Sequence, residues 1–429
     1  MEANNFTSQT SSIESAFTAR KLLTLREKFA AEEALDDRLA MEIIAEEIFG
    51  DEESGAFDDE TIDRIIQKLF FKTRRRLGIL QPLLEDDCVT EIMVNGPEHI
   101  FAERQGKIQR WPLSFDSVEE LTEIIRNIAG DVHREISEMN PIVDARLADG
   151  SRVNSVYSNV AVNGPILTVR KFSDKYMTMK DLTDNGTIAP EAAILLKTLV
   201  ECGYNIFVSG GTSSGKTTLL NALAEAIPKE ERVIVIEDSM ELKLSTIENI
   251  VHMECRNASS SGKGSVTMSQ LIKSSLRMRP DRIIVGEVRG AEVADMLQAM
   301  NTGHSGSMST GHGNSVEGML RRLEAMYLMA ATMDMDAIRS QIAEGIDIMV
   351  HIEKIDGKRQ ITEITELTGY EKGKFILNRL MDTVHNSRKT AGAAGSLIPT
   401  GNRIKNSRKI WLKGERYANL LRQHGFIDG

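Results

Sequence analysis

The sequence predicts an α/β protein in which a doubly wound parallel sheet follows a smaller α+β domain and a helical N-terminal extension. Three observations support this fold class. Strand-like and helix-like runs alternate in the C-terminal half, short strands with turn signals precede them, and the first residues are acidic with apolar positions at helical spacing. We therefore expect a helical extension over residues 1–76, an α+β domain over 77–174, a polar linker over 175–189, an α/β domain over 190–384 and a flexible basic tail over 385–429.

The N-terminal extension carries two apolar patterns at helical spacing on either side of an acidic stretch. The patterns are Leu35, Leu39, Ile43 and Ile44, and then Ile62, Ile65, Ile66, Leu69 and Phe70. Residues 51–60 between them are rich in Asp and Glu. The spacing predicts helices, and the acidic surface is either simply solvated or a site for a partner.

The second segment has the pattern of a compact α+β domain that ends near Phe172. Strand-like runs at 91–94, 100–102 and 107–108 are separated by Asn95-Gly96 and Gln105-Gly106, which are turn signals. A helix is expected over 118–129. Two further strands flank the hairpin signal Asp149-Gly150, and a last strand covers 166–169.

The α/β domain alternates strands and helices. The expected strands are 206–209, 233–237, 283–287, 307–310 and 348–352, with a peripheral hairpin near 361–367. The expected helices are 191–201, 216–226, 268–278, 291–300, 316–329 and 336–343. In such a sheet ligands bind where the strands end, at their carboxyl ends.

Composition restricts the class of protein. The chain has 429 residues and a formal net charge of −11, which argues against a nucleic-acid coat or a strongly basic membrane binder. Its three cysteines are far apart in the sequence, so we expect neither a disulfide framework nor a structural metal. We therefore expect the protein in the cytoplasm. No apolar run approaches the roughly 18 residues of a membrane span, and the N-terminus lacks the pattern of a signal peptide.

A glycine-rich loop between a strand and a helix is the most specific signal. It comprises Gly210, Gly211, Thr212, Ser213, Ser214, Gly215, Lys216 and Thr217, followed by Thr218. The pattern G-x-x-x-x-G-K-[ST] in this setting cradles phosphates with backbone N–H groups, helped by the helix N-terminus. We expect Lys216 to reach the outer phosphates of ATP and the Thr217 hydroxyl to bind Mg²⁺.

Three carboxylates follow buried-type strands. Glu287 ends the run 283–287, where an acid would hold or polarise water around Mg²⁺. Gly286 replaces the Asp often found just before such a Glu, so we expect contact with Mg²⁺ through water. Glu237 ends the run 233–237, and Glu241 lies shortly after it. We expect Glu241 to orient or deprotonate the attacking water and Glu237 to be the next choice, although the two roles could be exchanged.

Two histidines lie in a loop rich in glycine and hydroxyl groups. We expect His312 to donate to a terminal phosphate oxygen and His304 to support the loop. A metal site is the alternative, but no third ligand lies nearby in the sequence and Mg²⁺ prefers oxygen.

Arginines complete the candidate site, because a guanidinium matches the charge on a transferring phosphoryl group. The candidates are Arg277, Arg279, Arg282 and Arg289 around the strand of Glu287, and Arg146, Arg152 and Arg170 in the preceding domain. The tail is locally basic and small-residue-rich over 392–401, with a short helix expected over 409–423. It is either solvated or in contact with anionic lipid or an acidic partner.

Four ordered segments, 210–218, 233–241, 279–287 and 303–314, resemble the Walker A, Asp box, atypical Walker B and His box of the type II/type IV secretion ATPases. Shorter phrases resemble the Tad/Flp pilus assembly branch, usually called CpaF. They include Glu91-Ile92-Met93-Val94-Asn95-Gly96, Val143-Asp144-Ala145-Arg146-Leu147, Ser151-Arg152-Val153-Asn154 and Leu167-Thr168-Val169-Arg170-Lys171-Phe172. The resemblance covers roughly residues 77–380. Gly313 stands where this family commonly has alanine.

The resemblance implies a RecA-like ATPase domain preceded by an N-terminal domain, with nucleotide between them. It implies a cytoplasmic homohexamer, associated with the inner membrane through a platform protein, in which ATP turnover moves one domain against the other. The family arginines of the N-terminal domain map onto Arg146, Arg152 and Arg170.

Other functions stay open at this stage. A nucleic-acid-translocating motor shares the fold, but the acidic charge argues against a nucleic-acid partner. A nucleotide-gated scaffold without hydrolysis conflicts with the presence of Lys216, Glu241, Glu287 and His312. Within the secretion class, conjugation, effector secretion and pilus retraction are alternatives to pilus assembly.

Overall fold

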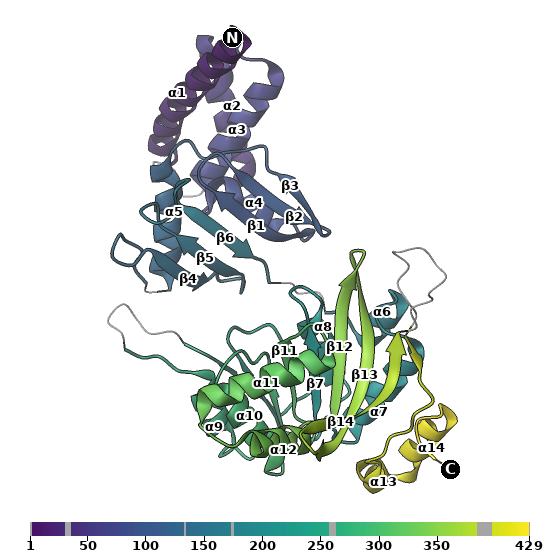
Figure 1. Cartoon of the computed structure of the whole chain (residues 1–429). Helices are drawn as coiled ribbons and strands as arrows, with labels where there is room; N and C mark the ends of the chain where they lie inside the picture. The colour runs from purple at the N-terminus through teal and green to yellow at the C-terminus, as the bar shows by residue number, and fades with distance from the viewer. Residues whose placement is uncertain are drawn as a thin grey trace. The chain divides into compact units, whose positions relative to one another are not determined.

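The computed structural model describes residues 2–30, 36–132, 134–172, 176–256, 263–383 and 397–428 (Figure 1). The chain divides into two compact units, Met1–Asp174 and Lys175–Gly429. Each has its own hydrophobic core, and the sequence patterns explain both.

The first unit begins with three helices, α1 (Glu2–Ala30), α2 (Asp37–Phe49) and α3 (Asp59–Arg74). Asp36 and Asp58 start α2 and α3 by accepting hydrogen bonds from backbone N–H groups three residues later. Their apolar faces enclose a core that includes Phe17, Ile44 and Leu69. Leu35 lies outside the described residues. No described helix combines the length and apolar character that a membrane span requires.

An antiparallel sheet completes the first unit. Its strands are β1 (Val89–Asn95), β2 (Ile100–Arg104), β3 (Lys107–Arg110), β4 (Ile142–Arg146), β5 (Arg152–Val156) and β6 (Ile166–Arg170), in the order β3-β2-β1-β6-β5-β4. The short helical segments η2 (Gly78–Leu80) and α4 (Gln81–Glu85) connect α3 to this sheet, and η1 (Glu52–Ala56) lies between α2 and α3. Helix α5 (Val118–Asp131), capped by Ser117, packs Leu121, Ile125 and Ile128 into the same core as the sheet.

The second unit is built on a mixed sheet. Its strands are β7 (Ile206–Gly210), β8 (Val233–Glu237), β9 (Ile250–Glu254), β10 (Arg282–Val285), β11 (Met308–His312), β12 (Ile348–Ile355), β13 (Lys358–Glu371), β14 (Lys374–Thr383) and β15 (Leu397–Pro399). The order is β15-β14-β13-β12-β7-β11-β10-β8-β9. Strands β12 to β9 in that order run parallel, whereas β13, β14 and β15 are antiparallel additions. The parallel part places the ends of β7, β8, β10 and β11 at one edge.

Helices cover both faces of this sheet, as the alternation of strands and helices predicts (Figure 1). They are α7 (Pro190–Glu201), α8 (Lys216–Ala224), α9 (Met268–Ser275), α10 (Glu292–Asn301), α11 (Val316–Ala330) and α12 (Met335–Gly345). Alternate residues of one strand enter different cores: Ile206 and Val208 pack with α7 and α8, whereas Phe207 packs with α9 to α12. The predicted α/β fold class is confirmed.

The segment 175–189, interpreted from sequence as a polar linker, is largely part of the second unit. Residues 176–178 are described without regular structure, but Met179–Asp184 form α6, which begins with a capping box between Thr178 and Asp181. Leu182 and Ile188 are buried in the core that contains α7 and α8. The segment is not a free linker, because the burial of Leu182 and Ile188 holds it against the core of the second unit.

The tail is also folded where the structure describes it, which corrects the expected flexible segment over 385–429. Residues 384–396 lie outside the described residues. Beyond them, helices α13 (Arg408–Lys413) and α14 (Glu415–Gln423) bury Ile410, Leu421 and Phe426 against the second unit. The Lys409 ammonium lies 2.6 Å from an Asp347 carboxylate oxygen, so part of the basic charge neutralises acids of the same unit.

Candidate nucleotide site

The glycine-rich loop joins the buried strand β7 to helix α8. Gly215 precedes the helix with a positive φ of 99°, a conformation that glycine adopts without strain. A side chain on Gly210 would collide with the carbonyl oxygen of Ile352 on the neighbouring strand β12. Gly211 has open space around its Cα, which leaves its face of the loop accessible. The loop is therefore shaped by its two crowded glycines and open toward a ligand.

Lys216 is folded into this loop. Its side chain is nearly buried, and its ammonium donates to the Gly211 carbonyl oxygen at 2.8 Å. The same nitrogen lies 3.3 Å from Nδ1 of His312, the last residue of β11. His312 reaches this place because β11 is parallel to β7 and pairs His312 with Gly210.

His312 continues the contact to Glu287, which follows β10. Its Nε2 lies 3.0 Å from Oε1 of Glu287. Because an ammonium can only donate, the Lys216 contact makes Nδ1 of His312 an acceptor, so Nε2 carries the proton and donates to Glu287. Burial lowers the pKa of His312, aided by the charges of Lys216, Arg289 and Arg322, against the opposing effect of Glu287. The neutral form of His312 therefore links the loop lysine to the strand-end acid.

Arg289 donates to both carboxylate oxygens of Glu287, to Oε1 at 3.0 Å and to Oε2 at 3.2 Å. Burial alone would raise the pKa of Glu287, but the hydrogen bond and charge of Arg289, with His312 and Lys216, hold that pKa below its usual value. Glu287 is consequently an ionised acceptor at neutral pH. The charge of Glu241 also acts on Arg289, which places these two side chains in electrostatic reach of each other.

Glu237 ends β8, the strand beside β10, and is bound differently. It is buried, and one of its carboxylate oxygens accepts the backbone N–H groups of Glu241 at 3.0 Å and Leu242 at 3.1 Å. A Cβ added to Gly286 would lie only 2.9 Å from Cγ of Glu237. The Glu237 side chain therefore fills the space that an Asp at position 286 would need. This explains the glycine that the sequence shows before Glu287.

Oxygen donors suited to Mg²⁺ are present beside the loop. Thr217 offers a hydroxyl in the first turn of α8, and Glu287 and Glu237 offer carboxylates at neighbouring strand ends; these hard ligands are the type that Mg²⁺ selects. The Ser214 hydroxyl is buried and has no hydrogen-bond partner in the described part of the chain, so it can donate to a ligand of the loop. Among the described residues no cluster of three His, Cys, Asp or Glu side chains has the arrangement of a metal site.

A second histidine, His304, supports the same region from a distance. Its Nδ1 lies 3.1 Å from the Ala299 carbonyl oxygen, and its own carbonyl oxygen accepts from the Ser307 hydroxyl at 2.7 Å. His304 thus fastens the turn between α10 and β11. The predicted supporting role remains a prediction, with these contacts in its favour.

Arg146, Arg152 and Arg170 belong to the first unit, where strand pairing sets them in a row. Arg146 is opposite Arg152 on β4 and β5, and Arg152 is opposite Arg170 on β5 and β6. Directly opposed residues project from the same face of a sheet, and like charges placed there are destabilising. Arg146 also donates through Nε to the Gly150 carbonyl oxygen at 3.1 Å.

Arg282, one of the arginines around the strand of Glu287, proves to be structural. It is almost fully buried, pairs with Glu231 and donates to the Val200 carbonyl oxygen at 2.6 Å. By contrast, Arg321 and Arg322 on α11 were not singled out from the sequence, yet they line a cavity beside the loop. Their one sequence signal was their place two turns after Ser315, at the start of a helix that follows the His box.

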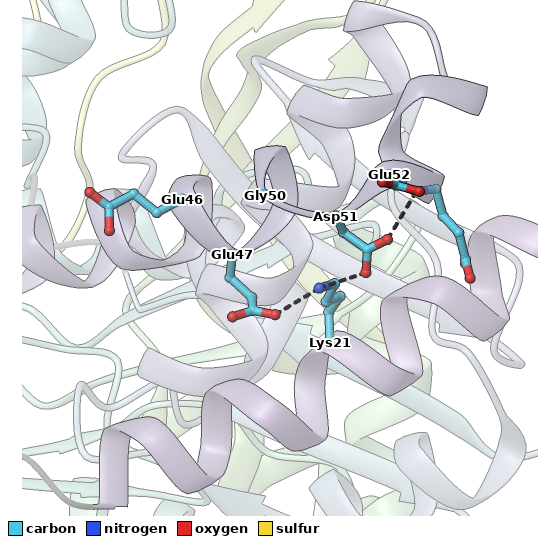
Figure 2. A pocket seen from close by; sticks show the side chains of 7 residues that line it. Lys21, Glu46, Glu47, Gly50, Asp51 and Glu52 are labelled. Atoms are coloured by element: carbon cyan, nitrogen blue, oxygen red, sulfur yellow. Dashed lines mark hydrogen bonds and ion pairs between the residues drawn. The ribbon is translucent and has the colours of Figure 1, made fainter.

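A separate hollow of about 460 Å³ lies among the N-terminal helices (Figure 2). Its walls carry the carboxylates of Glu46, Glu47, Asp51, Glu52 and Glu53. Figure 2 shows the Lys21 ammonium between Glu47 and Asp51, at 2.7 and 2.8 Å. Hydrogen bonds to Asp51 and Glu47 outweigh the effect of burial and raise the pKa of Lys21. The ion pairs of Lys21 connect α1 to the end of α2. The negative walls of the hollow would repel a phosphate.

Most of this chain is similar in sequence to known proteins. The family described as Type II/IV secretion system protein matches residues 73–379, which include the loop, both strand-end acids and His312. The chain belongs to this secretion family. Family relatives include the conjugal transfer protein TrbB of Rhizobium radiobacter, 31% identical over 297 residues, which are 68% of this chain and 88% of that protein. The type IV secretion system protein PtlH of Bordetella pertussis is 30% identical over 315 residues, 67% of this chain and 93% of its own length.

A solved structure of the pilus retraction motor PilT with bound ADP has a similar fold. It aligns with a TM-score of 0.51 at 18% identity and covers 81% of this chain and 89% of its own. At this identity the likeness supports the arrangement of an N-terminal domain and a RecA-like domain. The secretion family membership and the fold are thus established together.

Proposed function

We propose that this secretion family protein hydrolyses ATP and that the reaction powers the assembly of a Tad/Flp-type pilus. The observation that carries the proposal is the contact chain from Lys216 through His312 to Glu287. It joins the cation of a phosphate loop to an ionised acid at a strand end. A loop that merely turned the chain would have no need of these contacts.

The chemistry follows from the positions of the side chains. The loop residues 210–218 bind the phosphates through backbone N–H groups and Lys216. Thr217, and Glu287 through a water, would hold Mg²⁺, which would neutralise phosphate charge. A water oxygen forms a bond to the γ-phosphorus. The bond between the γ-phosphorus and the oxygen that bridges it to the β-phosphate breaks, which yields ADP and orthophosphate. The proton of that water passes to Glu241, with Glu237 as the alternative acceptor. His312 at the end of β11 donates to the terminal phosphate when its Nε2–H leaves Glu287.

Assembly is part of the proposal. The protein acts as a cytoplasmic homohexamer that is held at the inner membrane by a platform protein. Arg146, Arg152 and Arg170 neutralise part of the negative charge of the phosphates. Strand pairing places these three arginines on one face of the sheet. If Arg152 acts across a subunit interface, a trace of Arg152→Ala subunits should inhibit a wild-type assembly more than in proportion. Proportional dilution of activity would contradict that placement.

Conjugation or effector secretion is the second candidate, because one relative, TrbB, is named a conjugal transfer protein and another, PtlH, a type IV secretion system protein. Phrases such as Leu167-Thr168-Val169-Arg170-Lys171-Phe172 favour the Tad branch. Neighbouring genes separate the two: prepilin and prepilin peptidase genes support pilus assembly, whereas relaxase genes support conjugation. DNA-stimulated ATPase activity would favour a nucleic-acid motor instead.

Replacement of Lys216 by alanine tests the hydrolase proposal. Orthophosphate release by the purified full chain should be lost in Lys216→Ala, because the outer phosphates lose their cation. Lys413→Ala, on α13 in the same unit, is a matched control and should retain activity. Wild-type protein that releases no phosphate in any assembly state, or Lys216→Ala with normal turnover, would overturn the proposal.

A further inference from the structure

A cavity of about 700 Å³ opens beside the phosphate loop, within the second unit. Its walls include Gly211, Arg289, His312, Ser315, Arg321 and Arg322. The start of the loop forms one wall, and the first turns of α11 form the other. Neither wall contributes an acidic side chain.

Helix geometry explains why α11 presents arginine to this cavity. Ser315 caps the helix by accepting from the Gly318 N–H at 2.9 Å. Gly318 and Arg322 follow at spacings of three and seven residues, so they share one face of the helix with Ser315. Val316, Met319 and Leu323 are buried in the core on the other side. Gly318 adds no side chain between the loop and Arg322.

The charges around the cavity are not balanced. Arg289 is committed to Glu287, as described above. Arg321 and Arg322 are exposed, and among the residues that the structure describes neither has an ion pair or a side-chain hydrogen bond. The charge of Arg322 also reaches His312, on which it acts electrostatically. The guanidinium groups of Arg321 and Arg322 thus lie beside the loop without a protein partner among the described residues, and their forked donors match tetrahedral phosphate oxygens.

We propose that this cavity is a phosphate site in which Arg322, supplied by α11 of the same unit, binds the terminal phosphate group. The proposal rests on the proposed ATP hydrolysis and adds a cation that belongs to the unit carrying the loop. The ligand is a phosphate group from one of two sources: the γ-phosphate of bound ATP or the orthophosphate that cleavage releases. Arg321 lies one position beside Arg322 and widens the positive surface.

Nucleotide affinity distinguishes this role from a structural one. Binding of ADP and of the non-hydrolysable analogue AMP-PNP, each with Mg²⁺, is measured by calorimetry on the full chain. We expect Arg322→Gln to weaken AMP-PNP about 10-fold or more, on the scale of a lost charge-assisted hydrogen bond, and to leave ADP within about 2-fold. Arg322→Lys should recover part of the loss, because lysine restores the charge without the fork.

A second arm identifies the source of the phosphate. Orthophosphate is titrated, with ADP present, into the ATP hydrolysis reaction as an inhibitor of turnover. If the inhibition constant of orthophosphate is at least about 5-fold higher in Arg322→Gln than in wild type, the site binds the released product as well. Inhibition that is unchanged, together with weakened AMP-PNP, assigns it to the γ-phosphate alone, and both results support the site.

Controls separate this inference from the proposed function. Arg408→Gln removes an exposed arginine on α13 of the same unit and should change neither ligand. Normal AMP-PNP binding and phosphate inhibition in Arg322→Gln overturns the site, while hydrolysis by the wild type still stands. Equal loss of ADP and AMP-PNP shows a merely structural role and overturns it too. Wild-type protein that binds neither nucleotide ends both proposals.

Discussion

Two neighbouring parallel strands of the second unit each lead to a glutamate, one at the strand end and one two residues beyond it, and the two glutamates are bound in different ways. Glu237 at the end of β8 is buried and accepts backbone N–H groups from its own loop. Glu287 after β10 is bound by the side chains of Arg289 and His312. Backbone donors fix an acid in one place, whereas side-chain donors can rotate away or change protonation. The same sequence pattern, a buried run followed by an acid, thus produces one structural carboxylate and one adjustable carboxylate.

Gly286 connects these two ends. The absence of a side chain there leaves room for Glu237 beside β10, and the Gly286 carbonyl oxygen accepts from the Thr310 hydroxyl of β11 at 2.8 Å. A shift of β10 would therefore change the positions of both Glu237 and Glu287. The contrast between them predicts that their isosteric glutamine variants fail in different measurements.

Glu287→Gln should have the largest effect. The amide keeps the shape of the side chain but removes its charge, so its contacts with His312 and Arg289 change together. We expect phosphate release at least about 100-fold slower than in wild type, with ATP still bound. Turnover and nucleotide binding measure the two effects, and Glu344→Gln, an exposed acid at the end of α12, is the matched control. Normal turnover in Glu287→Gln would remove the functional half of the comparison.

Glu241→Gln and Glu237→Gln then divide the loop after β8. If Glu241 takes the proton of the attacking water, its variant should also slow turnover by about 100-fold and leave thermal stability unchanged. Glu237→Gln should instead lower the free energy of unfolding by about 1–3 kcal/mol, because a buried carboxylate that accepts two N–H groups is weakened. Thermal melts and phosphate release measure both variants.

The reverse outcome exchanges the two roles. A stable Glu237→Gln protein with turnover as slow as that of Glu287→Gln would make Glu237 the base and Glu241 its support. A Glu241→Gln variant with normal turnover would contradict the assignment of Glu241. In either case the difference between backbone-bound and side-chain-bound acids would no longer predict function.

Sequence reasoning located the fold and most of the candidate site because the signals are local. A loop that needs glycine at crowded positions, such as Gly210 and Gly215, leaves a pattern that is visible without the structure. Glu287 and His312 follow short apolar runs, so the end of each strand could be placed at one edge. The α/β fold class was confirmed for the same reason, since each strand and helix is visible in its own stretch of chain.

The features that sequence reasoning missed depend on distant neighbours. Leu182 and Ile410 lie in polar stretches, and only docking onto the second unit buries them. Arg282 and Arg322 are both arginines near the site in sequence, yet one is a buried structural cation and the other lines a cavity. No local pattern separates these two environments, because burial is decided by elements far away along the chain.

His312 offers the smallest and most specific test, because its contact with Glu287 requires the neutral ring. Burial lowers its folded pKa below the ordinary 6.5. Between those two values the unfolded chain binds more protons than the folded one, so stability falls as pH falls. Above pH 6.5 the ring is neutral in both states, and its contribution is complete.

We therefore expect the melting temperature advantage of wild type over His312→Gln to be constant from about pH 8 to 7 and to shrink as pH falls through 6.5. The transition of the second unit is identified as the one that added nucleotide shifts upward. His424→Gln, on the same unit outside this contact chain, controls for the loss of a histidine. The effect should be small, because the His312 side chain is a third exposed and solvent screens its charge. An advantage that is independent of pH, or that grows in acid, would mean that His312 does not bind Glu287 as a neutral donor, and the adjustable acid would lose its link to Lys216.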